Sequence, residues 1–259
     1  MFDQGSGAAI VVIPGVQGRW EWMRPALEAL SARCRTVSYS LCGDFGSGRR
    51  IDPALGFENY LLQLDAVLDD AGLEQTALCG VSYGGLVALR YAATRPNRVS
   101  ALILSSSPAP GWAPTEQQQR WIASPWRSAP AFIATSPGRL LPEIRTALPG
   151  WRERLAFSVR HVLRVAAAPM KPPLMASRVT WQQKMDFRQD CANVQAPTLV
   201  ISGDEALDRV VPVKVTRTYA SLIGRVRCEV IERTGHIGLL TRPDRFASLV
   251  SDFVHANSH

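Results

Sequence analysis

Residues 77–94 read ALCGVSYGGLVALRYAAT, and this stretch decides the fold that we expect for the chain. An apolar strand leads into the turn GVSYGG, and an apolar helical pattern follows it directly. A serine at the apex of such a strand-to-helix turn needs small neighbours, because larger flanking side chains would clash. The turn pushes the hydroxyl of Ser82 out over the sheet and sets the backbone N–H of Tyr83 at the positive end of the helix. We therefore predict Ser82 as a nucleophile and the N–H of Tyr83 as a donor to a developing oxyanion.

Short apolar runs alternate with helical patterns along most of the chain. This alternation predicts an α/β fold with a mostly parallel central sheet of about six strands, flanked by helices. The expected strands are residues 8–14, 35–41, 75–79, 99–104, 198–202 and 227–231. The expected helices are residues 19–33, 60–73, 86–94, 213–223 and 245–254. Few residues precede the first of these strands, so we expect no N-terminal hairpin and a sheet whose strands are all parallel.

The alternation is lost between residues 109 and 196, which are rich in Pro, Trp, Arg and helical patterns. We interpret residues 109–196 as a helical cap, or lid, inserted into a core domain made of residues 1–108 and 197–259. The cap is also basic. Between residues 111 and 190, twelve Lys and Arg stand against five Asp and Glu, an excess that equals the net charge of +7 of the whole chain.

The loop after the first strand, Pro14-Gly15-Val16-Gln17-Gly18, is the expected source of a second oxyanion donor. Its glycines let the backbone come close to a substrate carbonyl. We predict the N–H of Val16 as this donor and Gly15 as a substrate contact. The alternative is that this loop, like the turn around Ser82, is a plain tight turn.

A serine hydroxyl becomes a strong nucleophile when an adjacent base takes its proton and a third group orients that base. The chain has four histidines, namely His161 in the cap, His236 after the last expected strand, and His255 and His259 in the C-terminal tail. Only His236 follows a strand, and sites in parallel α/β sheets gather at the carboxyl ends of strands. We predict His236 as the base and interpret His161 as a packing or surface residue.

The orienting acid is expected after the strand that ends at residue 202, where Asp204, Glu205 and Asp208 are available. The order serine, aspartate, histidine, with a strand before each, resembles the α/β-hydrolase superfamily, and the resemblance extends from about residue 10 to residue 254. In that family the acid commonly precedes a hydrophobic pair and a proline. The sequence DRVVP at residues 208–212 matches this pattern, so the resemblance implies Asp208 as the acid and the α/β-hydrolase fold with a helical cap.

Two features depart from the family's usual pattern. Four residues separate Gly203 from Asp208 where two are usual, so the loop has to double back, and Asp204 stays an alternative acid. Pro14-Gly15 stands where a His-Gly pair usually opens the oxyanion loop, which removes a side chain but leaves the backbone donor. A serine nucleophile in place of an aspartate argues against the dehalogenase and epoxide-hydrolase branches of the family.

Acyl transfer to water is the reaction that this set of residues favours. We predict a serine esterase that cleaves small to medium acyl or aromatic esters through an acyl-enzyme on Ser82. The same triad serves thioesterases, cofactor-free perhydrolases or haloperoxidases, and C–C bond hydrolases, and a non-catalytic ligand-binding protein of this fold is a further alternative. We expect no cofactor and no metal site, because no His, Cys and Asp residues cluster at ligand spacing.

The expected partner is a small-molecule ester substrate, with no nucleic acid and no membrane span. The basic residues form no terminal arm or helix stripe, and no apolar run approaches the roughly 18–20 residues of a membrane helix. The N-terminus lacks the basic start of a signal peptide, and the five scattered cysteines suggest no disulfide framework. We therefore expect a cytoplasmic monomer or homodimer.

Five of the seven tryptophans lie in the cap, and the other two follow the oxyanion loop. We predict substrate contacts for Trp20 and Trp112, against the alternative that such side chains hold the cap in place. The charge of the cap suggests an anionic substrate, such as a coenzyme A thioester or an acidic carrier protein. The arginines that would steer it are Arg120, Arg127, Arg160 and Arg164. Solvated arginines on a cap surface are the simpler interpretation.

Overall fold

A computed structural model describes residues 1–257 of the chain, so His259 lies outside the described residues. It contains a seven-stranded sheet with the strand order β1-β3-β2-β4-β5-β6-β7. The strands are β1 (Phe2–Gln4), β2 (Ala9–Ile13), β3 (Arg35–Ser38), β4 (Thr76–Val81), β5 (Val99–Ser105), β6 (Thr198–Ser202) and β7 (Val226–Val230). All pairs from β3-β2 to β6-β7 are parallel. The expected mostly parallel α/β sheet is confirmed.

The expectation of an all-parallel sheet of about six strands is wrong at the N-terminus. β1 pairs antiparallel with β3 and sets Phe2 opposite Ser38. Phe2 is buried, and Asp3 forms an ion pair with Arg35 at 2.9 Å. Three residues suffice for this strand because one side chain is buried and another is paired across the ladder.

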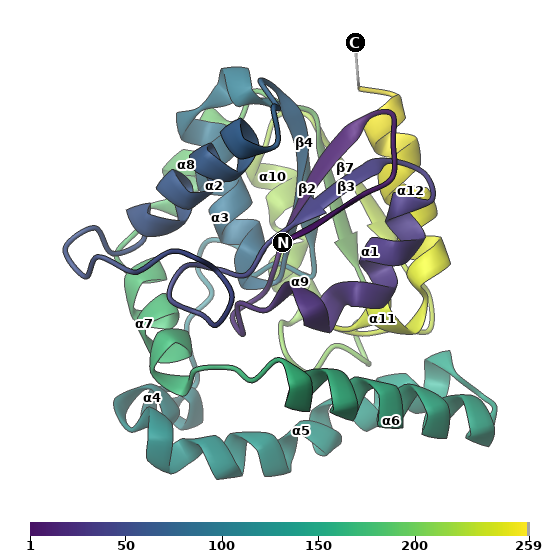
Figure 1. The fold of residues 1–259 in the computed structure, drawn as a ribbon. Coiled ribbons are helices and arrows are strands. Elements are labelled where there is room, and N and C mark those ends of the chain that lie inside the picture. The colour runs from purple at the N-terminus through teal and green to yellow at the C-terminus, as the bar shows by residue number, and fades with distance from the viewer. Residues whose placement is uncertain (258–259) are drawn as a thin grey trace.

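Helices cover both faces of the sheet (Figure 1). One face carries α1 (Arg24–Ser31), which follows a 3₁₀ turn at Trp20–Met23, together with α11 (Gly238–Thr241) and α12 (Pro243–His255). The other face carries α2 (Glu58–Asp70), α3 (Tyr83–Thr94), α9 (Val213–Thr216) and α10 (Tyr219–Leu222). The single helix expected at residues 213–223 is wrong, because the chain forms the two short helices α9 and α10. Val213, Val215 and Thr216 are β-branched and disfavour a long helix, and the buried Tyr219 hydroxyl donates to the carbonyl of Pro108 at 2.6 Å.

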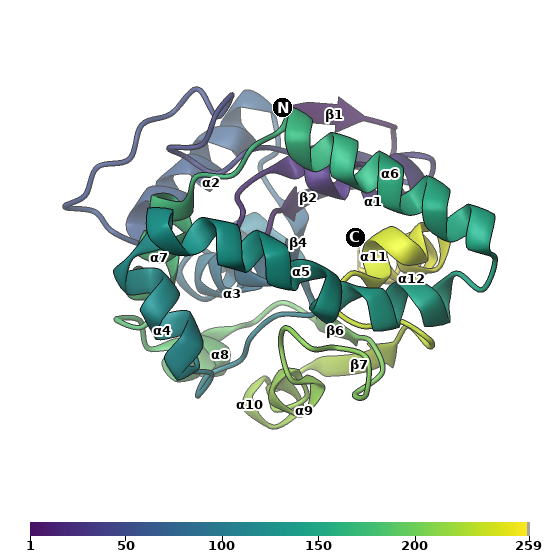
Figure 2. The same ribbon diagram turned by 90° about the horizontal axis from the view of Figure 1, so that it is seen from below.

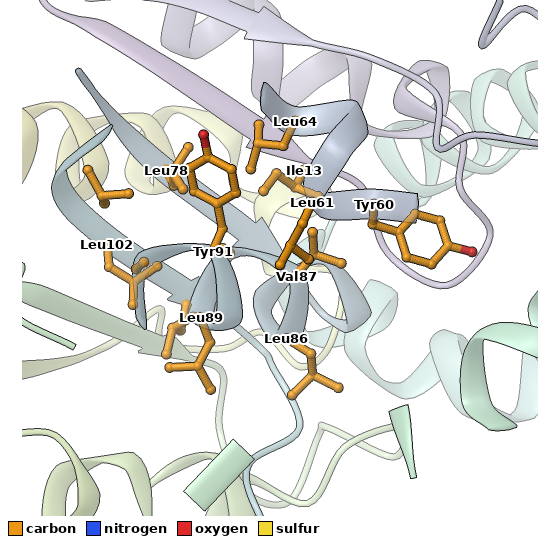
Figure 3. Packing of buried hydrophobic residues seen from close by; sticks show 14 of the residues in the cluster. Ile13, Tyr60, Leu61, Leu64, Leu78, Leu86, Val87, Leu89, Tyr91 and Leu102 are labelled. Atoms are coloured by element: carbon orange, nitrogen blue, oxygen red, sulfur yellow. The ribbon is translucent and has the colours of Figure 1, made fainter. Parts of the chain in front are cut away.

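Each face of the sheet has its own hydrophobic core, because successive side chains of a strand point to opposite sides. In β2, Ile10 and Val12 pack toward α1 and α12, whereas Val11 and Ile13 pack toward α2 and α3. Figure 3 shows Ile13 and Leu78 from the strands meeting side chains from α2 and α3, such as Leu64 and Val87. Burial on both faces explains the continuous apolar runs of the central strands.

Five helices lie between β5 and β6, namely α4 (Glu116–Ala123), α5 (Pro125–Ala147), α6 (Trp151–Ala167), α7 (Pro172–Gln182) and α8 (Phe187–Asn193). Figures 1 and 2 show α4–α7 across one end of the sheet, with α5 and α6 as two separate helices that cross that end. In contrast, α8 packs on α3, where Asp190 pairs with Arg90 at 3.1 Å. Within residues 1–257, no helix is both long and apolar enough to cross a membrane.

Candidate active site

Ser82 occupies a strained turn between β4 and α3. Its backbone has φ 52° and ψ −121°, a conformation that costs energy for a residue with a side chain. Gly80 and Gly84 make the turn possible. A Cβ on Gly80 would lie 2.3 Å from the carbonyl oxygen of Gly84, and a Cβ on Gly84 would lie 2.3 Å from that of Ile13. The small residues around Ser82 are therefore required by direct backbone contact.

The structure brings Ser82, His236 and Asp208 into one line of contacts. Nε2 of His236 lies 3.1 Å from Oγ of Ser82, and Nδ1 of His236 lies 3.2 Å from Oδ2 of Asp208. Ser82 follows β4, Asp208 follows β6 and His236 follows β7, so the parallel strands present all three at the same edge of the sheet. This is the arrangement of a nucleophile, a base and an orienting acid.

Asp208 reaches His236 because its loop turns back on itself. The N–H of Asp208 donates to the carbonyl of Asp204 at 3.1 Å, which closes the helical turn that absorbs the extra loop residues. Oδ1 of Asp208 accepts N–H bonds from Val210 and Val211, both at 2.9 Å, and Oδ2 stays available to the imidazole. The side chain of Asp204 instead accepts the N–H of Arg233 at 2.7 Å. Of the two candidate acids, Asp208 is the one that contacts His236.

The charges at this site shift two pKa values in opposite directions. Burial lowers the pKa of His236, but the charge and hydrogen bond of Asp208 outweigh it, with a further contribution from Glu143, so that the pKa lies above its ordinary value. Burial raises the pKa of Asp208, yet His236 and the backbone N–H groups of Val210 and Val211 outweigh it and hold that pKa below its usual range. Both shifts favour an imidazolium beside a carboxylate.

The loop after β2 lies against Ser82. A Cβ on Gly15 would be 3.5 Å from the Cβ of Ser82, which makes Gly15 an immediate neighbour of the hydroxyl-bearing carbon. The loop closes through a bond of 2.9 Å from the N–H of Gly18 to the carbonyl of Gly15. Tyr83, which directly follows Ser82, buries its ring against Phe57 at a centroid distance of 6.0 Å. Val16 is half-buried in the same loop.

Arg178, a wholly buried residue of α7, binds the loop after β2. The guanidinium of Arg178 donates to the carbonyl of Val16 at 2.8 Å and pairs with Asp44. Its Nε donates to the hydroxyl of Tyr60 at 3.2 Å. Neither Arg178 nor Asp44 stands in a recognisable motif, so the sequence carried no signal for this contact.

The tryptophans and arginines that were predicted to contact substrate lie in different parts of the structure. The ring of Trp20 packs on Phe2, with centroids 5.6 Å apart, as part of the core beside α1. Trp112 lines a pocket of about 480 Å³ with residues such as Met185 and Arg188. Arg120, Arg127 and Arg160 are exposed on the surface of α4–α6, and Arg164 is partly buried there. No contact in the described part of the chain joins these residues to Ser82, and their substrate roles stay predictions.

His161 and His255 are the other two histidines among residues 1–257. His161 stacks on Phe157 with centroids 5.9 Å apart and meets the edge of Trp22, which agrees with packing as its role. His255 ends α12, where its Nε2 lies 3.9 Å from Sγ of Cys34. The same described range contains no group of three or more His, Cys, Asp or Glu side chains placed to hold a metal ion.

Glu143, a buried carboxylate of α5, is a residue of this region that was not predicted from the sequence. Its Oε2 accepts the N–H of Ile237 at 3.0 Å, and its Oε1 faces the hydroxyl of Thr241 at 3.4 Å. Ile237 directly follows His236. No periodicity or motif marks a glutamate in a helix as the partner of a loop 94 positions away.

Comparison with known proteins places the chain in a family. It matches the family model described as the alpha/beta hydrolase fold over residues 8–243, and it belongs to that family of hydrolases. It is 29% identical to a 2-hydroxymuconate semialdehyde hydrolase of Pseudomonas sp. (strain CF600), over 98% of this chain and 89% of that protein. It is 26% identical to a pimeloyl-(acyl-carrier protein) methyl ester esterase of Aliivibrio salmonicida, over 97% of this chain and 94% of that protein.

Among solved structures, a thermophilic esterase from Thermogutta terrifontis aligns with a TM-score of 0.82 and 22% identity, over 100% of this chain and 93% of that chain. At this level of identity the likeness shows the shared fold. The two relatives named above are hydrolases whose names give different reactions. The family is therefore established, while the bond that this chain cleaves has to be argued from its site.

Proposed function

We propose that this protein hydrolyses carboxylic esters through an acyl-enzyme on Ser82. The observation that supports the proposal most directly is the continuous line of contacts from Ser82 Oγ to His236 Nε2 and from His236 Nδ1 to Asp208 Oδ2. In such an arrangement the histidine takes the proton of the serine hydroxyl, which can then attack a carbonyl carbon. The similarity to a methyl ester esterase is consistent with it.

In the proposed reaction, Ser82 Oγ attacks the ester carbonyl while His236 takes its proton. The backbone N–H groups of Val16 and Tyr83 stabilise the oxyanion, and Gly15 leaves room for the carbonyl to approach. His236 then returns the proton to the leaving alcohol. A water attacks the acyl carbon while His236 takes its proton, the bond from this carbon to Oγ of Ser82 breaks, and the proton passes from His236 to Oγ as the carboxylic acid leaves. Asp208 stabilises the imidazolium in both halves of the reaction.

We also propose that the core and the inserted helices have different roles. Residues 1–108 and 197–259 form the core that carries the triad, and residues 109–196 act as a cap that shapes the substrate site. Contacts of Arg178 with the carbonyl of Val16 and of Glu143 with the N–H of Ile237 support this division, because both connect inserted helices to loops beside Ser82. The substrate is a small to medium acyl or aromatic ester.

The test is hydrolysis of a p-nitrophenyl ester series from acetate to decanoate. The wild type is compared with Ser82→Ala and with Ser221→Ala, which removes an exposed hydroxyl outside the site. We expect turnover by the wild type and by Ser221→Ala, and a loss of roughly 10³-fold or more in kcat/KM for Ser82→Ala. A folded wild type that cleaves no member of the series would overturn ester hydrolysis.

Hydrolysis of a C–C bond is the second candidate. It is favoured by the 29% identity to a 2-hydroxymuconate semialdehyde hydrolase over 98% of this chain. The same three side chains serve both reactions, so the substrate decides between them. Turnover of 2-hydroxymuconate semialdehyde, the compound in the name of that relative, with a kcat/KM well above that of every ester would replace the first proposal by the second.

A further inference from the structure

Glu143 is a buried acid that the proposed reaction does not use. It is 1% exposed, although it comes from α5, a helix whose other side faces solvent. No Lys or Arg forms an ion pair with it among residues 1–257, and the cationic side chain whose charge acts on it is His236. A buried carboxylate without a cationic partner is costly, so its place needs a reason.

Its partners are groups next to the catalytic histidine. Oε2 of Glu143 accepts the N–H of Ile237 at 3.0 Å, and the N–H of Gly235 faces the same carboxyl and lowers its pKa. These two N–H groups flank His236 on either side. The hydroxyl of Thr241, in α11, donates to Oε1 at 3.4 Å. Every polar contact of the carboxyl comes from a donor, which favours the ionised form, but burial outweighs these contacts and raises the pKa of Glu143 above its usual value.

We propose that Glu143 is a positioning residue, which holds the backbone on both sides of His236 so that the imidazole stays aligned between Ser82 and Asp208. This inference rests on the proposed function for its consequence in catalysis. The contact spans 94 positions and joins an inserted helix to the loop after β7. The alignment of the base therefore depends on the docking of α5, and a poorly docked α5 lowers turnover.

Charged groups on the neighbouring elements do not neutralise Glu143. Arg209, Arg233 and Arg242 all face α5, but their guanidinium groups donate to its backbone carbonyls, those of Gly138, Thr146 and Ala147. The charges that face the imidazole are thus Asp208 from the loop after β6 and Glu143 from α5. Both favour the imidazolium, and removal of either charge lowers the pKa of His236.

The test compares the wild type with Glu143→Gln, Glu143→Ala and the control Glu153→Gln, which neutralises an exposed carboxylate of α6. We expect Glu143→Ala to lower kcat by roughly tenfold to a hundredfold with little change in KM. Glu143→Gln keeps one acceptor oxygen and should recover most of kcat. In both variants the acidic limb of the kcat/KM profile shifts to lower pH, because the base stays neutral further into acid, whereas Glu153→Gln follows the wild type.

An NMR titration of the His236 ring, identified by its loss in His236→Asn, measures the same effect without turnover. A lower His236 pKa in Glu143→Gln than in wild type supports the proposal even if the protein cleaves no ester. If Glu143→Ala does not fold, Glu143→Gln still supplies both measurements. A folded Glu143→Ala with the kcat of wild type, or a folded Glu143→Gln whose acidic limb and ring titration coincide with those of wild type, would overturn the proposal. If the wild type cleaves no ester but the His236 pKa is lower in Glu143→Gln than in wild type, the ester proposal is overturned and the positioning role stands.

Discussion

Nε2 of His236 lies 3.1 Å from Oγ of Ser82 although 154 positions separate the two residues. The distance is set by the sheet. β4 and β7 are parallel members of one sheet, so the loops that leave their carboxyl ends meet at one edge. Asp208 lies at the same edge, in the loop after β6. His236 therefore lies between Ser82 and Asp208 and contacts both.

Asp208, and not Asp204, is expected to act as the acid. Asp208→Asn keeps the shape of the side chain but removes the charge that orients His236, so kcat/KM should fall by about 10³- to 10⁴-fold. Asp204→Asn is the matched variant in the same loop, and it should retain activity within about tenfold because Asp204 accepts the N–H of Arg233 instead. Steady-state kinetics of both variants would contradict the assignment if Asp204→Asn were the more damaged.

The raised pKa of His236 predicts a pH-dependent contribution to stability. A group whose pKa is higher in the folded state than its ordinary value of 6.5 stabilises the fold fully below that value, and the contribution is lost as pH rises through the folded pKa. A tenfold difference in proton affinity between the folded and unfolded states corresponds to about 1.4 kcal/mol. Urea unfolding should therefore show wild type more stable than His236→Gln by a larger margin at about pH 5.5 than at about pH 9. An equal or larger margin at the higher pH would contradict this.

Gly84→Ala tests the close approach of α3 to β2. The new Cβ would lie 2.3 Å from the carbonyl oxygen of Ile13 and 2.6 Å from that of Pro14, so the loop beside Ser82 has to move. We expect a loss of about 1–3 kcal/mol in the free energy of unfolding, together with reduced kcat. Gly138→Ala is the control. It lies in α5 with open space around it, and should leave stability unchanged or raise it by about 0.5–1 kcal/mol.

Arg178→Met is expected to destabilise the protein by about 3–5 kcal/mol, because it leaves the buried carboxylate of Asp44 without its partner. The double variant with Asp44→Leu removes both charges and should be more stable than the single variant. Denaturant unfolding of the two gives the comparison. A single variant that costs less than about 1 kcal/mol would show that the pair does not hold α7 in place.

Much of the site could be anticipated because its parts are local in sequence. The glycines around Ser82, the apolar strand before it and the DRVVP pattern at 208–212 each reflect the geometry of one short segment. The strand β1 could not be anticipated, since three residues carry no periodicity and their pairing depends on a contact with Arg35. Glu143 and Arg178 were missed for a related reason, because their contacts depend on how inserted helices dock over distant loops.

Covalent labelling by a fluorophosphonate tests whether Ser82 is a nucleophile that His236 activates. Intact-mass analysis of wild type, Ser82→Ala and His236→Asn, each shown to be folded, follows the reaction. We expect one adduct on wild type, mapped by peptide sequencing to Ser82, with no adduct on Ser82→Ala and a much slower reaction for His236→Asn. A folded wild type that stays unlabelled, or an adduct of equal rate on Ser82→Ala, would contradict this expectation.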